Sequence, residues 1–387
     1  MTLTYLDFLK FIKKHEIKYV KLHFNNLFFY EDSITLSVKQ FDEKVYNNGI
    51  VHHSTQTKFS DIFDKKIIVK PEFCTFFIDP FTTQNTLTIV SDIIIEDHAI
   101  ISPRIIAKNL LKHLLTKDKF QQMCFQPTLT FYIFDDFYLK SSDKTSCYKL
   151  SYNKEDLENI RSEICTVLND IGINVASHFT GKLPNICNIQ LASIKMQDVK
   201  DQLYIAKYIA KNVVMSYGKK LTYMPLPLNN SHPIETSIAF NFSKNIKFPK
   251  DIFIKNSIYA FTNPTTNSFK RIALLNEQTP RIISTTDKFD VKFSDSTADP
   301  YLAMAAILLM LDCANDKNQI TNSKCKCNSL TLSKAIKSLD NDRKFFTKYS
   351  NTFSDEFINS YIALKKRELR SHSVAPTPLE IETYFNI

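Results

Sequence analysis

The chain has 387 residues, of which 44% are hydrophobic and 23% are charged, and this composition is typical of a folded globular protein. The chain is long for one domain, so its length predicts two domains, one of them large. The formal net charge is +9, yet the lysines are scattered and no basic run alternates with aromatic residues that could stack on bases, so the charge does not indicate a nucleic-acid partner. Only 4 glycines are present, which leaves few positions for the tight loops that hold phosphates.

The sequence predicts a cytoplasmic protein without a membrane partner. Its N-terminus lacks the basic-then-apolar order of a signal peptide, and its longest apolar stretch, residues 303–311, is too short to cross a bilayer. The 8 cysteines form no Cys-x-x-Cys pair, and Cys325 and Cys327 have no second pair with which to bind zinc. We therefore expect reduced thiols, most of them in the core.

The first hundred residues predict a small α+β domain over residues 1–100. Residues 4–15 have apolar positions at helical spacing and predict a helix. Residues 19–30 alternate in polarity and break at two asparagines, which predicts a hairpin. Residues 64–71 and 85–94 predict two further strands, and a helix with several short strands is typical of an α+β unit.

A second, larger domain is predicted over residues 101–387. Pro103 suits the first turn of a helix, and Gly218 suits the end of one. The helix at residues 298–314 is apolar nearly all round and should be buried. Strands are predicted at 124–136, 185–193 and 234–243, and helices at 103–115, 154–171, 198–218, near 251–261, and 298–314.

An ordered series of short motifs runs along almost the whole chain. The series comprises FFIDPFTTQNTLTIVSDI (76–93), GKKLTYMPLP (218–227), NPTTNSFKR (263–271), FDVKFSDSTADPYLAMAAILLMLD (289–312) and TPLEIETYF (377–385). In this order the motifs resemble those of bacterial-type glutamine synthetases and their relatives, the γ-glutamyl-amine ligases. The resemblance implies an α+β fold in which a β-grasp domain precedes a catalytic domain whose curved antiparallel sheet holds the active site.

The resemblance also implies a chemistry that depends on metal ions. The family joins glutamate to ammonia or an amine through a γ-glutamyl phosphate formed from ATP. Divalent cations neutralise the phosphates during such a transfer, and they prefer carboxylate-rich oxygen ligands, helped in this family by histidine. The residues at the matching positions can therefore be checked one at a time.

Most of the expected metal ligands are replaced. Thr128 and Thr130 stand where the family's EPE strand has two glutamates, and Phe179 takes the first glutamate position of its HHE…NE stretch. The second glutamate position of that stretch falls on Asn188 or, with one residue of slack, on Cys187. The two threonines alternate along one strand, as the glutamates do, so we expect a polar but uncharged cavity.

The substrate segment NGSGMHxH corresponds to residues 232–239, where its glycines are gone and Ser237 and Ala239 stand at the histidine positions. Only Asp290 keeps a carboxylate at a metal-ligand position. For Asp290 we favour local hydrogen bonding over metal binding, because one carboxylate cannot assemble a metal cluster.

The basic side of the expected site is also reduced. Arg271 matches an arginine that contacts the glutamate substrate in the family, and it is interpreted either as an anion-binding residue or as a structural one. The family's arginine-rich segment SRNRSASIRIP corresponds to a shorter interval that offers Arg281, and Lys292 replaces the arginine of the EVRF motif.

These replacements favour a catalytically inactive glutamine synthetase-like protein with a binding, regulatory or scaffolding role, for which no cofactor is expected. The alternative is an ATP-dependent glutamate–ammonia or glutamate–amine ligase with a rebuilt site, which would need ATP and Mg²⁺ or Mn²⁺. A sensor that binds an amino acid or a nucleotide without turnover is a further alternative. Because family members assemble into rings, the resemblance also implies a homo-oligomer or a hetero-assembly with active paralogues.

Overall fold

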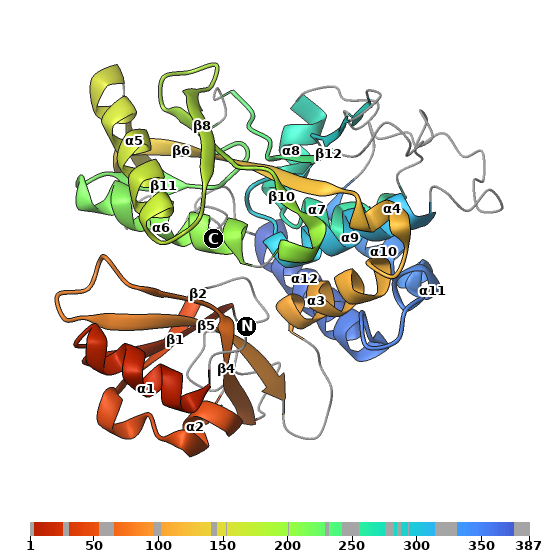
Figure 1. Ribbon diagram of the computed structural model, residues 1–387. Coiled ribbons are helices and arrows are strands. Elements are labelled where there is room, and N and C mark those ends of the chain that lie inside the picture. Colours follow the sequence, from red (N-terminus) through yellow and green to blue (C-terminus); the bar gives the residue numbers. More distant parts are fainter. Residues whose placement is uncertain are drawn as a thin grey trace.

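The computed structural model describes most of the chain as two β-sheets with their covering helices (Figure 1). No helix in the described ranges is long and apolar enough to span a bilayer. The described ranges are 4–25, 31–53, 66–95, 102–140, 145–151, 153–199, 201–228, 232–241, 255–274, 282–284, 288–292, 294–313 and 331–374.

The first sheet is mixed and carries a helix across one face. Its elements are α1 (Tyr5–Lys14), β1 (Tyr19–Asn25), β2 (Glu31–Ser37), α2 (Glu43–Asn48), β3 (Ile50–His53), β4 (Lys66–Ile78) and β5 (Thr86–Ile95). The strand order is β2-β1-β5-β4-β3, with β1 and β5 parallel and every other neighbouring pair antiparallel. Thr4 caps α1 by accepting a hydrogen bond from the backbone of Asp7, and Phe8 of α1 packs on Phe73 of β4 with ring centroids 5.5 Å apart. This arrangement is the predicted β-grasp.

The second sheet is antiparallel and is built around one long strand. Its members are β6 (Cys124–Lys140), β7 (Thr145–Leu150), β8 (Val175–Thr180), β9 (Ile186–Leu191), β10 (Ile194–Lys195), β11 (Lys220–Thr222), β12 (Ser237–Asn241), β13 (Ile282–Ser284) and β14 (Lys288–Val291). The order is β13-β14-β12-β6-β9-β8, and β7, β10 and β11 also pair with β6. Residues 127–134 of β6 are all buried, so both faces of this central strand are covered. The strongly curled antiparallel sheet agrees with the predicted fold.

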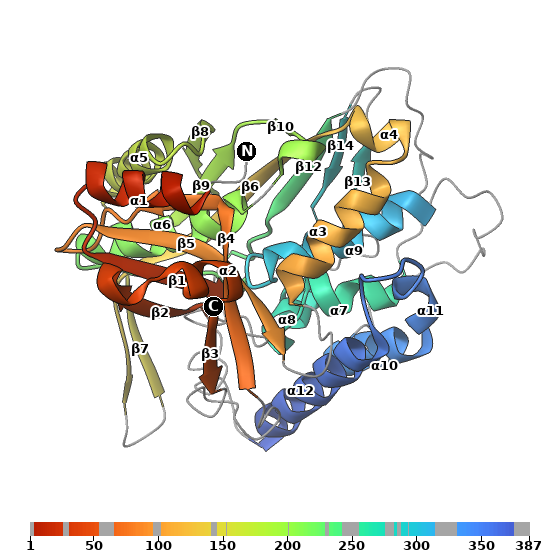
Figure 2. The same ribbon diagram turned by 60° about the horizontal axis from the view of Figure 1, so that its bottom comes forward.

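Helices cover the second sheet and separate it from the first (Figure 1). They are α3 (Pro103–Leu114), α4 (Asp118–Gln121), α5 (Lys154–Asp170), α6 (Gln202–Ser216), α7 (Tyr259–Thr262), α8 (Thr266–Leu274), α9 (Pro300–Cys313), α10 (Leu332–Asn341), α11 (Arg343–Phe346) and α12 (Asp355–Val374). Every residue from 300 to 312 is buried, and α9 lies between α3 and α7 (Figure 2), which confirms the predicted burial of this helix.

Helix α6 lies between the two sheets (Figure 1). Polar side-chain contacts join the sheets in this region. The Tyr208 hydroxyl on α6 donates to Asp79 beyond β4 at 2.7 Å. Arg104 at the start of α3 contacts Asp201, which precedes α6, and also Asp92 of β5, with an N–O distance of 2.7 Å in each pair. The junction is therefore held by buried charges as well as by apolar packing.

Two helix boundaries differ from the prediction. Helix α6 ends at Ser216 rather than at Gly218, because Gly218 has a φ of +69° and lies just beyond the helix in the left-handed conformation that ends it. The helix predicted near 251–261 begins as a 3₁₀ turn at Asn256–Ile258 before α7, and residues 251–254 lie outside the described ranges.

The expectation that most cysteines lie in the core is wrong for those that the structure describes. Cys187 is buried, whereas Cys74 is exposed and the other described thiols are intermediate. Cys74 lies where the pairing of β4 with β5 shifts register between Pro71 and Phe76, so its side chain leaves the core. Cys325, Cys327 and the predicted domain boundary at residue 100 lie outside the described residues.

Candidate functional site

The strand register gathers the predicted ligand positions on one face of the second sheet. Directly opposite residues of an antiparallel pair share a face, and so do alternate residues along a strand. Thr128 on β6 lies opposite Ser237 on β12, and Thr130 lies opposite Asn188 on β9. Asp290 on β14 lies opposite the residue two positions after Ser237. We call these five side chains the polar face.

The members of the polar face hydrogen-bond to one another. The Thr130 hydroxyl donates to Asn188 Oδ1 at 2.8 Å, and the Ser237 hydroxyl donates to Asp290 Oδ1 at 2.5 Å. Thr128, Thr130 and Asn188 are buried. One of these bonds thus joins two neutral side chains and the other joins a hydroxyl to the single carboxylate, so the polar face presents hydroxyl and amide groups rather than clustered negative charge.

Phe179 and Lys292 flank the polar face. Phe179 on β8 lies opposite Asn188 and is 46% exposed, so an aromatic ring stands at a predicted glutamate position. Lys292 Nζ lies 3.7 Å from Asp290 Oδ2. The carboxylate of Asp290 on β14 therefore lies close to the ammonium group of Lys292, which follows the same strand.

The donor set does not fit a Mg²⁺ or Mn²⁺ cluster. Such ions take about six oxygen ligands with several carboxylates among them. The polar face supplies one carboxylate, and no three His, Cys, Asp or Glu side chains of the described chain come together in a way that could hold a metal.

A buried lysine lies beneath the polar face. The Ser296 hydroxyl donates to the backbone carbonyl of Thr130, and the backbone carbonyl of Ser296 accepts from Lys207 Nζ at 2.9 Å. Burial lowers the pKa of Lys207 to about 8, although nearby carboxylates such as Asp299 oppose this shift. The segment 294–299 thus connects the polar face to the domain junction.

Arg271 lies in an enclosed site at the end of α8. It is 0% exposed, and one guanidinium nitrogen donates to the side-chain oxygen of Asn263 at 2.8 Å. Another guanidinium nitrogen lies 3.0 Å from Glu235 Oε1, and the Glu235 side chain is 17% exposed. Arg271, which the sequence analysis identifies as a candidate site residue, thus has Glu235 of the same chain as an acidic neighbour.

Sequence reasoning missed Glu235, although a signal is present. The substrate segment NGSGMHxH, placed on residues 232–239, puts its second glycine at position 235. A glutamate at a glycine position, together with a retained arginine, is the pattern expected when the chain supplies its own counter-charge. Arg281, another of the three predicted remnants beside Arg271 and Lys292, lies outside the described residues.

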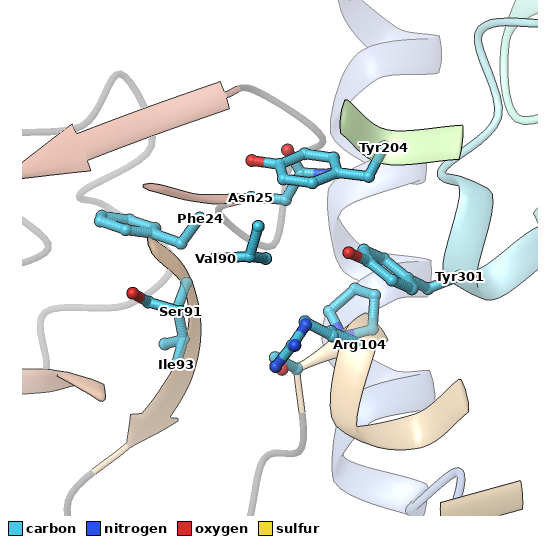
Figure 3. A pocket seen from close by; sticks show the side chains of 10 residues that line it. Phe24, Asn25, Val90, Ser91, Ile93, Arg104, Tyr204 and Tyr301 are labelled. Carbon is cyan, nitrogen blue, oxygen red and sulfur yellow. The ribbon is translucent and has the colours of Figure 1, made fainter. Parts of the chain in front are cut away.

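Two cavities lie at the junction of the sheets, away from the polar face. Figure 3 shows the smaller one, where the Asn25 and Tyr204 side chains meet the start of α3 at Arg104. Its volume of about 10 Å³ matches one water molecule and excludes an amino acid or a nucleotide. The larger, of about 210 Å³, is lined by residues of β4, the turn after α5 and the start of α6, and by no member of the polar face.

The β-grasp sheet and the curled antiparallel sheet with its polar face together define a ligase-type α+β fold. The family model for the glutamine synthetase catalytic domain matches residues 101–245 and 252–384, which is more than half of the chain. The chain therefore belongs to the glutamine synthetase family.

Relatives and solved structures agree with this assignment. The glutamine synthetase of Rhizobium meliloti strain 1021 is 25% identical and that of Escherichia coli K12 is 26% identical, each alignment covering 98% of this chain and 99% of the relative. The cryoEM structure of Plasmodium falciparum glutamine synthetase superposes with a TM-score of 0.79 at 19% identity, covering 100% of this chain and 99% of the other. Ligand-free GmaS superposes with a TM-score of 0.72 at 16% identity, covering 97% and 98%. These two superpositions concern the fold alone.

Proposed function

We propose that this protein is a glutamine synthetase-like protein without ligase activity, and that it has a binding, regulatory or scaffolding role. The observation that carries the proposal is the polar face. Its Thr128, Thr130, Asn188 and Ser237 are neutral, and its one carboxylate, Asp290, already lies beside Lys292.

The physical argument concerns charge. Phosphoryl transfer needs divalent cations to neutralise charge that develops in the transition state, and cation affinity rises with the number of carboxylates in the site. One carboxylate beside one ammonium group has no net charge, so a dication gains little by replacing its hydration shell. Loss of several members of a catalytic unit typically costs orders of magnitude in rate.

The proposal has consequences for cofactors and partners. We expect neither ATP nor Mg²⁺ or Mn²⁺ as a cofactor. We favour a cytoplasmic protein that acts as part of an assembly, either a homo-oligomer or a complex with active paralogues. The division into residues 1–100 and 101–387 is part of the same proposal.

Two alternatives have support of their own. A ligase with a rebuilt site is supported by relatives named glutamine synthetase and by the retention of Arg271 and Asp290. A sensor that binds an amino acid or a nucleotide without turnover is supported by the guanidinium of Arg271, from which an anionic group would have to displace Glu235.

Calorimetry and an activity assay separate the three. The purified protein is titrated with ATP in the presence of Mg²⁺ or Mn²⁺, and phosphate release is followed with glutamate and a panel of amines. An active glutamine synthetase is measured in parallel as the positive control.

We expect neither metal-dependent ATP binding nor turnover. Binding with turnover would establish the ligase and reject the proposal, whereas binding without turnover would favour the sensor. Native mass measurement, alone and with an active paralogue, then tests the assembly role.

A further inference from the structure

The contact between Glu235 and Arg271 is an internal ion pair, and it involves the arginine for which the family resemblance implies either an anion-binding or a structural role. Arg271 has no exposed surface, and its guanidinium lies between Asn263 Oδ1 at 2.8 Å and Glu235 Oε1 at 3.0 Å. A guanidinium out of contact with water needs a counter-charge, because an uncompensated buried charge is strongly unfavourable.

The backbone on both sides of Glu235 is fixed. The Ile234 N–H donates to the Pro225 carbonyl at 2.9 Å, and the Thr236 N–H donates to the Ser294 carbonyl at 3.0 Å. These two bonds attach the segment to the loop that follows β11 and to the loop that follows β14, and they direct the intervening residue. The carboxylate is therefore held near Arg271 by the fold and not by the ion pair alone.

The two partners differ in their access to solvent. The Glu235 side chain keeps 17% of its surface exposed, while that of Arg271 has none. Removal of the Glu235 side chain would therefore open a route from solvent to the guanidinium. The space left beyond Cβ would have the size of a small carboxylate.

We propose that Glu235 is an internal ligand that occupies the carboxylate-binding side of Arg271 and excludes free carboxylates from it. Without Glu235, Arg271 becomes a receptor for a small carboxylate ion. The inference goes beyond the absence of ligase activity, since it involves neither a metal nor ATP and holds whichever way the activity assay turns out.

The test is rescue of a variant by acetate. Glu235→Ala is melted in sodium acetate and in sodium chloride at equal ionic strength, and the wild type is treated identically. A ligand that binds only the folded state raises the melting temperature. We expect acetate to raise the melting temperature of Glu235→Ala by about 2 °C or more over chloride, and to leave the wild type unchanged.

Two further variants identify the receptor. In Glu235→Ala/Arg271→Met the guanidinium is absent, so the acetate effect should disappear. Glu158→Ala removes an exposed glutamate of α5 and controls for the change in net charge; it should show no acetate effect.

Equal responses of the wild type and Glu235→Ala would overturn the proposal. So would an acetate effect that persists without Arg271 or that appears equally in Glu158→Ala. If Glu235→Ala does not fold in chloride, the comparison is made on refolding yield, where the proposal requires more folded protein in acetate and an equal yield would refute it.

Discussion

Because His23 is buried, we expect mild acid to lower the free energy of unfolding by a measurable amount. His23 lies on β1 at the domain junction, is 2% exposed, and has its ring centroid 5.1 Å from that of Tyr204 and 4.8 Å from that of Tyr208. Burial, reinforced by the charge of Lys21, lowers the pKa of His23 from 6.5 to about 3. The imidazole is therefore neutral in the folded protein under conditions in which the unfolded chain would protonate it.

The sign of the effect follows from proton uptake. Below the unfolded pKa of 6.5 the unfolded chain binds a proton at His23 and the folded chain does not until about pH 3, so the free energy of unfolding falls as the pH falls through this window. At about 1.4 kcal/mol per pKa unit, lowering the pH from about 7.5 to about 5.5 should cost about 1.4 kcal/mol, and the full shift about 5 kcal/mol.

Urea unfolding at the two pH values measures this loss. His23→Leu replaces the ring with an apolar side chain of similar volume and should reduce the acid-induced loss by about 1.4 kcal/mol relative to the wild type. Burial raises the pKa of the Asp299 carboxyl, so this group makes the free energy of unfolding rise as the pH falls, opposite to His23. The acid-induced loss of His23→Leu is therefore compared with that of the wild type and not with zero.

A control variant keeps His23 and changes a histidine elsewhere. His15→Gln, just after α1, should lose as much stability in acid as the wild type. An equal acid-induced loss in His23→Leu and the wild type would refute the reasoning, because the titrating group would then lie elsewhere.

Other predictions concern the junction and the polar face. Tyr208→Phe removes the hydrogen bond to buried Asp79 and should lower the free energy of unfolding by about 1–2 kcal/mol, measured in urea, with no change expected if the bond contributes nothing. Thr130→Val leaves the Asn188 amide oxygen without its donor and should cost about 1–3 kcal/mol; a neutral result would show that the pair is not formed. Thr130→Glu places a second carboxylate on the polar face with Asp290 and should lower the melting temperature in the absence of metal. Mn²⁺ should partly restore the melting temperature of this variant. An equal rise of the wild-type melting temperature in Mn²⁺ would contradict the assignment of the effect to the polar face.

The fold class and many of the elements could be predicted from the sequence, because they depend on local pattern and on ordered motifs; the location of the functional site stays a prediction. The periodicity of residues 298–314 predicted a buried helix, and α9 is buried on every side. Thr128 and Thr130 lie on β6, and Asn188 lies opposite Thr130 on the neighbouring strand β9. Alternation along each strand explains why these side chains share one face.

Sequence reasoning failed where a side chain's environment depends on residues far away along the chain. The contact of Glu235 with Arg271 joins the loop before β12 to helix α8, and no periodicity marks it. The burial of His23 arises from α6 packing against β1, so a residue that looks like an ordinary strand histidine becomes a titration-sensitive group. The residues of each such pair lie far apart in the sequence. The hydrophobic pattern of one segment does not predict how the segments between them pack.

The pairing of β6 has a consequence for how the chain is made. Thr128 of β6 is matched with Ser237 of β12, more than a hundred positions later, and β14 joins the sheet through β12 later still. During synthesis the hydrogen-bonding edge of β6 that β12 will cover has no partner until those strands leave the ribosome, and such contacts form slowly. An apolar strand with an open edge is prone to pair with other chains. The central strand that organises the finished sheet is thus also a segment of the nascent protein that is exposed to aggregation until β12 has been made.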